Sequence, residues 1–151
     1  MVMVLDKEKA EELGLRSVAN LTIPDSVTSI GDHAFDDCKT LHSVVIPDSV
    51  TIIGRDAFAQ CKNLTSVTMP NSVVVISRGA FWRCENLQSI VIPNRVTSIS
   101  QSAFYECKNL INVIMPDGIT SIGAHAFTDC KNLRRIAIYT GQCGYYWRPC
   151  V

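Results

Sequence analysis

Seven cysteines and three histidines are the residues in this chain whose side chains could support thiol chemistry, disulfide bonding or metal binding. Five of the cysteines recur every 23 residues, at Cys38, Cys61, Cys84, Cys107 and Cys130. In a stacked repeat, equivalent residues lie about 4.8 Å apart with parallel Cα–Cβ vectors, whereas a disulfide needs Cβ atoms that converge to about 3.8 Å. A straight row of sulfur atoms also cannot surround one ion tetrahedrally. We therefore predict that these five cysteines are free, buried thiols.

The histidines and other polar residues show no arrangement suited to catalysis. His33 and His125 share a repeat position, but four repeats separate them, which is roughly 19 Å at the spacing of stacked strands. His42 occupies a different position and has no further ligand types beside it. The sequence shows no clustered nucleophile and base and no glycine-rich phosphate loop. We therefore expect a protein that is not an enzyme and that uses no cofactor or metal ion.

The cysteine interval reflects a repeat that organises most of the chain. Phenylalanines precede the five cysteines by three residues each, at Phe35, Phe58, Phe81, Phe104 and Phe127. Five complete repeats occupy residues 18–40, 41–63, 64–86, 87–109 and 110–132, and a partial sixth runs through Thr140. A unit of this length cannot bury its own apolar face, so neighbouring units must stack around one continuous core. The sequence therefore predicts a repeat solenoid over residues 18–140.

Each repeat contains two short apolar pairs followed by a turn. In the second repeat Val44 and Ile46 are two residues apart in a β-branched run, which predicts a strand with both side chains inward. Pro47 ends this strand because it cannot donate a ladder hydrogen bond, and a second apolar pair follows at Val50 and Ile53. The Ala-Phe-x-x-Cys-x-x-Leu stretch is apolar at every third residue. This spacing predicts one helical or 3₁₀ turn with the Phe and Cys side chains inward.

The repeated pattern Leu-x-x-Val/Ile-x-Ile/Met-Pro-x-x-Val-x-x-Ile-Gly-x-x-Ala-Phe-x-x-Cys-x-x-Leu resembles the BspA-like class of leucine-rich repeat across residues 18–140. The resemblance implies a right-handed superhelix or horseshoe with a parallel β-sheet on its concave side and the short helical or 3₁₀ turns on its convex side. It also implies a protein without enzymatic activity. Members of the family are often surface or secreted proteins implicated in adhesion to host proteins or to other cells.

Strand alternation separates the outward side chains from those in the core. The outward positions form two columns, one small and polar and the other small and largely apolar. They include Ser43, Val45, Ser66, Thr68, Ser89, Val91, Asn112, Ile114 and Arg135. Because charged residues are depleted in the cores of protein interfaces, we predict that this concave face binds a protein partner. The alternatives are an indifferent solvent-exposed face or, from a column of threonines interrupted by Val74, an ice-binding surface.

Residues 1–17 and 141–151 lie outside the repeats. Residues 6–13 are expected to form a short helix, and we expect the whole of 1–17 to cap the first repeat. For residues 141–151 the sequence predicts an aromatic C-terminal cap, closed by a Cys143–Cys150 disulfide under oxidising conditions. The alternative is a disordered tail. The segment is also a candidate secondary contact, because it contains the hot-spot residue types Tyr145, Tyr146, Trp147 and Arg148. The alternative function is therefore a structural or self-associating protein that assembles through the array ends or this segment.

Composition limits the partners. The formal net charge is zero at pH 7 and the isoelectric point is about 6.8, so we expect no nucleic acid partner. No apolar run is long enough to span a membrane, and the first residues do not form a secretory signal. Together with the free thiols, this indicates a cytoplasmic chain, whereas the family resemblance implies the cell surface or secretion.

Overall fold

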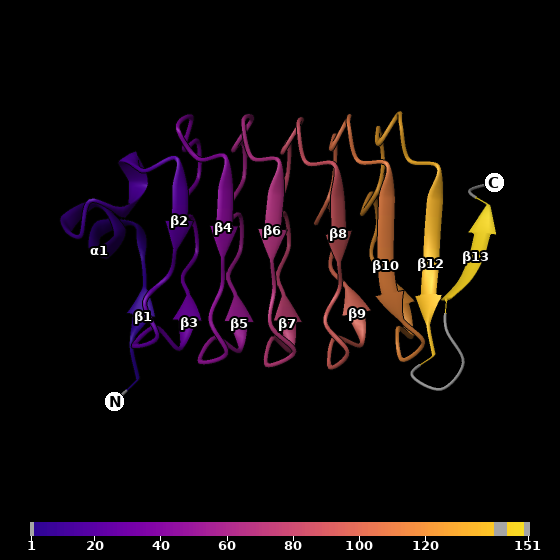
Figure 1. The fold of residues 1–151 in the computed structure, drawn as a ribbon, viewed down its shortest axis with the longest axis horizontal. Coiled ribbons are helices and arrows are strands. Elements are labelled where there is room, and N and C mark those ends of the chain that lie inside the picture. The colour runs from indigo at the N-terminus through magenta and orange to yellow at the C-terminus, as the bar shows by residue number, and fades with distance from the viewer. Residues whose placement is uncertain (1, 141–144, 150–151) are drawn as a thin grey trace.

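The computed structural model describes residues 2–140 and the backbone of residues 145–149. Consecutive repeats stand side by side along the long axis of the molecule and contribute their strands to two rows (Figure 1). The strands of consecutive repeats run parallel wherever they pair. The fold is therefore a parallel-strand solenoid, as the repeat period predicts.

Apart from β1, which precedes the repeats, the strands of the two rows come from successive apolar pairs of each repeat. The first row contains β2 (Asn20–Thr22), β4 (Ser43–Val45), β6 (Ser66–Thr68), β8 (Ser89–Val91), β10 (Asn112–Pro116) and β12 (Arg135–Tyr139). The second row contains β1 (Val4–Leu5), β3 (Ser29–Ile30), β5 (Ile52–Ile53), β7 (Val75–Ile76), β9 (Ser98–Ile99) and β11 (Ser121–Ile122). Paired strands of two repeats align residues 23 positions apart, such as Val44 with Val67. Each repeat position therefore forms a column along the solenoid.

The phenylalanine column forms the centre of the core. Consecutive rings lie parallel to within 6°, and their centroids are 5.3–5.5 Å apart. The first four rings are fully buried, whereas Phe127, at the end of the array, is half-buried. Because each ring covers the face of the next, a single repeat could not bury its own ring.

The cysteine column lies beside the rings as free thiols. The thiols of the second to fifth repeats each donate to the carbonyl oxygen of the phenylalanine in the preceding repeat, at 3.0–3.2 Å. The prediction of buried thiols is confirmed for Cys38, Cys61, Cys84 and Cys107, whereas Cys130 is half-buried. Burial raises the pKa of the Cys84 thiol well above its usual range, so this thiol stays neutral at physiological pH.

The stretch that carries the Phe and Cys residues is not helical. Throughout the repeats it consists of consecutive turns closed by backbone hydrogen bonds between residues three apart, such as that from the N–H of Cys61 to the carbonyl oxygen of Phe58 at 3.3 Å. These bonds have the spacing of the predicted 3₁₀ turn, but they do not continue into a helix. The cause is a pair of left-handed residues in each repeat, such as Asp56 with φ 52° and Gln60 with φ 58°. A positive φ interrupts a right-handed helix. The N–H of Phe58, between these two residues, instead donates to the carbonyl oxygen of Ala80 in the next repeat at 2.8 Å.

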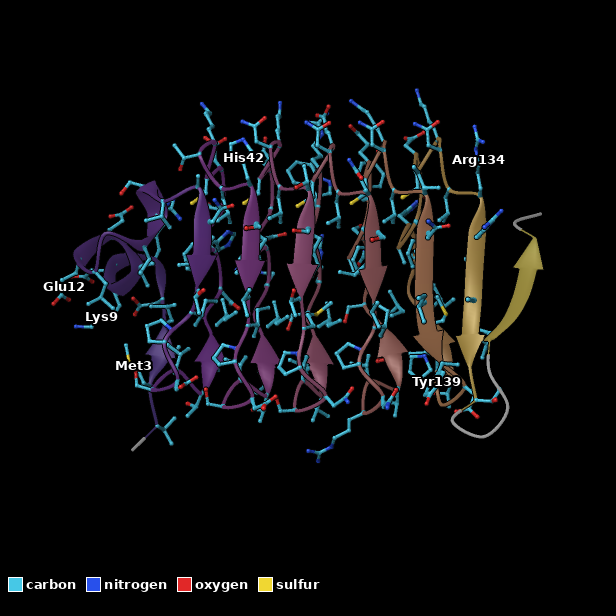
Figure 2. All side chains as sticks on the ribbon, viewed as in Figure 1. Met3, Lys9, Glu12, His42, Arg134 and Tyr139 are labelled. Atoms are coloured by element: carbon cyan, nitrogen blue, oxygen red, sulfur yellow. The ribbon has the colours of Figure 1, made fainter. Side chains whose placement is uncertain are left out.

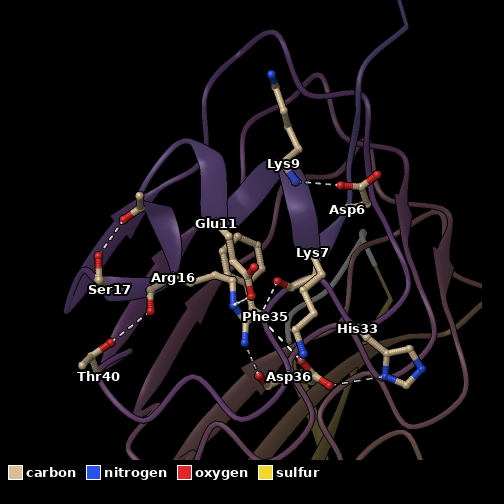
Figure 3. Close-up of polar contacts among 12 residues, drawn as sticks. Asp6, Lys7, Lys9, Glu11, Arg16, Ser17, His33, Phe35, Asp36 and Thr40 are labelled. Atoms are coloured by element: carbon tan, nitrogen blue, oxygen red, sulfur yellow. Dashed lines mark hydrogen bonds and ion pairs between the residues drawn. The ribbon is translucent and has the colours of Figure 1, made fainter.

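The N-terminal segment contacts the first turn. It contains α1 (Lys7–Glu12), within the residues expected to form a helix, and a 3₁₀ helix at Leu15–Ser17. The guanidinium of Arg16 donates to the carbonyl oxygens of Ala34 at 2.6 Å and Asp36 at 2.8 Å (Figure 3). These contacts hold the segment against the first repeat.

The C-terminal segment contributes one further strand. β13 (Tyr145–Pro149) pairs antiparallel with β12 and extends the first row (Figure 1). The predicted contact residues Tyr145, Tyr146, Trp147 and Arg148 belong to this strand, of which the backbone is described. Cys143 and Cys150, with their predicted disulfide, lie outside the described residues.

The strand pairing lapses once within the array, between the third and fourth repeats. β6 does not pair with β8, and β7 does not pair with β9, among the described residues. The backbone N–H groups in this part of the described chain that lack the carbonyl partner their column otherwise provides include those of Met69, Thr97 and Ser100. On the turn side the backbone hydrogen bonds between repeats continue across this gap, because the N–H of Phe81 donates to the carbonyl oxygen of Ala103 at 2.9 Å. We call this interruption the seam.

A serine explains part of the seam. At the corner before each turn the repeats approach so closely that a Cβ added at Gly54 would lie 2.7 Å from the backbone nitrogen of Asp32. Ser100 carries a Cβ at this corner and stacks on another serine, Ser77, instead of on a glycine. Its hydroxyl, instead of its backbone N–H, donates to the carbonyl oxygen of Ile76 at 2.6 Å. At Gly123 the backbone N–H makes the equivalent bond to the preceding repeat at 2.7 Å.

Ser100→Gly should restore the missing backbone bond at this corner. We expect the amide at position 100 to exchange with solvent at least tenfold more slowly than in the parent, because a protein hydrogen bond protects it. Hydrogen exchange followed by NMR measures this rate. Ser77→Gly is the matched control, because the N–H of Ser77 already donates to Ile53 at 3.0 Å. Unchanged exchange at position 100 would show that the serine does not cause the local gap.

The buried thiols should make stability fall at alkaline pH. The unfolded chain releases the Cys84 proton above about pH 8.5, whereas the folded chain retains it because its pKa is raised. Stability is therefore full below that pH and is lost above it, by about 2 kcal/mol between pH 8 and 10 for one such thiol. Urea unfolding at the two pH values should show a smaller loss in Cys84→Ser, which keeps a hydrogen-bond donor. An identical loss in parent and variant would exclude this linkage.

Candidate binding surfaces

The outward side chains of the first strand row form the first candidate surface. We call it the strand-face strip, and it comprises Ser43, Val45, Ser66, Thr68, Ser89, Val91, Asn112, Ile114 and Arg135. The parallel register brings neighbouring members together: Val45 pairs with Thr68, and Val91 pairs with Ile114. The structure therefore places these residues in columns, with the seam between the halves that end at β6 and begin at β8.

The strip is uncharged over most of its length. Val45 is 42% exposed and Val91 is 56% exposed, whereas the inward residues beside them, Val44 and Ile90, are buried. The hydroxyl of Ser43 donates to the side-chain oxygen of Asn20 at 2.8 Å. Neighbouring side chains of the polar column therefore bond to each other at this end of the strip. Arg135 is the member of the strip with a formal charge.

The column one residue before the polar column of the strip contains two residues that can carry a positive charge, and they lie far apart. His42 lies at the start of β4 and Arg134 at the start of β12, toward opposite ends of the array (Figure 2). Nδ1 of His42 lies 2.7 Å from the carbonyl oxygen of Thr40, in its own turn. These two side chains do not contribute to one site.

The turn side of the solenoid carries most of the ion pairs. Arg83 lies 2.9 Å from Glu106, and Lys108 lies 3.1 Å from Glu85, so both pairs link neighbouring repeats. The hydrogen bond from Arg83 lowers the pKa of the Glu106 carboxyl. Solvent screens such exposed pairs, so they fix side-chain positions more than they stabilise the array.

The histidines of the turn side also stay apart. In the first repeat, His33 lies 3.6 Å from Asp36 (Figure 3). It also lies 4.0 Å from Asp56 of the second repeat. In the fifth repeat, His125 lies 3.4 Å from the hydroxyl of Thr128. No group of three or more metal-binding side chains gathers within the residues that the structure describes.

A hollow on the turn side is the second candidate surface, and sequence reasoning missed it. It has a volume of about 520 Å³ and spans the first four repeats. We call it the turn-face hollow, and its lining includes Arg55, Asp56, Ala59, Gln60, Arg78, Gly79, Trp82 and Ser102. A second hollow, of about 340 Å³, shares Trp82 and Ser102 with it and extends toward Tyr105.

The signal for this hollow lies in the positions at which the repeats differ. One column reads Asp36, Ala59, Trp82, Tyr105 and Thr128 from the first repeat to the fifth. Another column reads His33, Asp56, Gly79, Ser102 and His125. Small residues in the middle of both columns, beside a tryptophan, leave the space that the larger side chains of other repeats would fill.

No helix among the described residues has the length and apolar character needed to cross a membrane. No match was found among curated proteins. The protein-family model described as the BspA type leucine rich repeat region matches residues 14–138 of this chain, in six copies.

Solved bacterial structures share the fold. A leucine rich repeat protein of T. pallidum is 31% identical, with a TM-score of 0.77, over 80% of this chain and 58% of its own. A leucine rich cell surface protein of Faecalibacterium prausnitzii is 34% identical, with a TM-score of 0.76, over 82% of this chain and 33% of its own. The chain thus spans less than two thirds of either relative. The repeat pattern, the stacked strands and the family match together show that the chain belongs to the BspA-type leucine-rich repeat family.

Proposed function

We propose that the chain is a non-catalytic module that binds a protein partner through the strand-face strip. The observation that carries this proposal is the exposure of Val45 and Val91 on a surface with one formal charge. Interface cores are depleted of charged residues, and apolar side chains at their centre provide most of the binding energy. The family's leucine-rich repeats support an interaction role.

The rigidity of the strip favours binding. Its side chains stand on strands whose register with neighbouring repeats is set by backbone hydrogen bonds. β-branched side chains such as Val91 and Ile114 have few rotamers to lose. A partner therefore meets a preformed surface, and little conformational entropy is lost when it binds. The apolar centre lies where Val91 pairs with Ile114.

The location of such a partner follows from the relatives. One similar structure is named as a leucine rich cell surface protein. We propose by analogy that the partner is met at a cell surface.

Val91→Arg combined with Ile114→Arg should abolish this interaction, because it places two charges at the apolar centre of the strip. Partners captured by the parent protein are titrated against the variant by biolayer interferometry, and the affinity should fall at least a hundredfold. The matched control is Val75→Arg combined with Ile122→Arg, which changes two exposed residues of the second strand row. Equal affinity of parent and strip variant, or a loss confined to the control variant, would contradict the proposal.

A second candidate function is self-association through the C-terminal end. β13 is the last strand of its sheet, and its outer edge pairs with no other strand among the described residues. An open strand edge is a template for pairing with another chain. Light scattering before and after deletion of residues 141–151 tests this function. A parent that is a monomer, or an oligomer that survives the deletion, would exclude assembly through this segment.

A further inference from the structure

The turn-face hollow differs from the strand-face strip in shape and in chemistry. Its floor contains Ala59 and Gly79, where neighbouring repeats carry larger side chains. Gly79 adopts a left-handed conformation with φ 64°, and a Cβ at this position would collide with the carboxylate of Asp56. The carboxylate of Asp56 therefore occupies the room that the glycine leaves. The hollow lies where two columns carry small residues, Ala59 and Gly79, in consecutive repeats.

The hollow contains positive charge that the protein does not neutralise. Arg55 and Arg78 occupy the same position in consecutive repeats, and both are exposed. Arg55 approaches Asp56 only at 4.0 Å, and Arg78 has no ion pair among the described residues. Nearby cations are engaged elsewhere, because Arg83 binds Glu106 and Lys108 binds Glu85. The carboxylate of Asp32, at the same position of the first repeat, accepts from the backbone N–H of Arg55 at 2.7 Å. Two guanidinium groups in consecutive repeats whose closest ion pair among the described residues is at 4.0 Å favour an anionic ligand.

The acidic group at the far side of the hollow is already neutralised. The carboxylate of Asp36 lies 2.9 Å from Nζ of Lys7 and 3.5 Å from the guanidinium of Arg16 (Figure 3). It therefore opposes an incoming anion less than its formal charge suggests. Asp56 in the lining of the hollow is weakly paired, at 4.0 Å from both His33 and Arg55, and its oxygens can accept hydrogen bonds from hydroxyl groups of a ligand.

Trp82 adds a flat apolar surface to this charged site. The indole lines both hollows of the turn side and is half-buried. The guanidinium of Arg83 lies over the ring, 5.2 Å from its centroid, and is itself bonded to Glu106. These contacts hold the ring in one orientation. Gln60 and Ser102 provide neutral hydrogen-bonding groups beside it.

We propose that the turn-face hollow binds a sugar residue that carries a carboxylate, as part of a longer glycan. The C–H groups on one face of a sugar ring carry partial positive charge and stack on the negative face of an aromatic ring. Hydroxyl groups of the sugar bind Gln60, Ser102 and Asp56, and the carboxylate binds the forks of Arg55 and Arg78. The volume of about 520 Å³ lies within the usual range of small-ligand sites. The hollow is open to solvent, so the remaining sugar residues of the glycan can extend out of it.

The proposal is independent of the strand-face strip, and the experiment keeps the two apart. The parent protein is applied to a glycan array that contains carboxylated, sulfated and neutral glycans, and each bound glycan is then titrated by calorimetry. We expect carboxylated glycans to bind, and their methyl esters and neutral analogues to bind at least tenfold more weakly. Arg78→Gln and Trp82→Ala should each weaken binding about ten- to hundredfold, since each removes a charge-assisted or stacking contact.

Matched variants separate a built site from general charge attraction. Arg95→Gln removes an exposed arginine outside the hollow and should leave the affinity unchanged. The double variant of Val91 and Ile114 should also bind the glycan normally, even if it loses its protein partner. Absence of any bound carboxylated glycan would overturn the proposal. So would equal binding of sulfated glycans, or an equal effect of Arg78→Gln and Arg95→Gln, because each would indicate unspecific ion attraction.

Discussion

The structure depends on the stacking of each repeat against the next. Phenylalanine rings 5.3–5.5 Å apart form one column through five repeats, and turn N–H groups such as that of Phe58 bind the carbonyl oxygens of the next repeat. Neither the ring nor the N–H has a partner within its own repeat, so the folding of each unit is coupled to that of its neighbours. The stacking residues recur every 23 residues in the sequence because each repeat must present them to the next.

Stacking also determines where function can lie. Positions that face the core must stay apolar in every repeat, as Ile46, Met69 and Ile92 do, so most changes in chemical character lie in outward columns. On the strand side these columns give a smooth strip with Val91 and Ile114 at its centre. On the turn side the loss of side chains at Ala59 and Gly79 opens a hollow beside Trp82. The seam shows the same dependence, because one corner residue, Ser100, replaces a backbone bond with a bond from its hydroxyl.

The strand positions and the core could be predicted from the sequence because they follow from the period and from alternation. The course of the turn could be predicted only in part, since apolar residues at every third position suit both a continuous helical segment and the consecutive three-residue turns observed. The distinction lies in the backbone of residues such as His33 and Gln60, whose positive φ angles carry no strong sequence signal when the residue is not glycine. The turn-face hollow was missed because it arises between columns, where side chains of different repeats become neighbours only after stacking.

Amide hydrogen exchange across the seam tests most directly whether the turn side unites the repeats. The N–H of Phe58 donates to Ala80 within the paired half of the array, and the N–H of Phe81 donates to Ala103 across the seam. If stacking through the turn and the phenylalanine column couples all repeats, both amides should exchange only with global unfolding and at the same free energy. Exchange of the Phe81 amide as rapid as that of the unpaired Met69 amide would contradict it, and would show two halves that open independently.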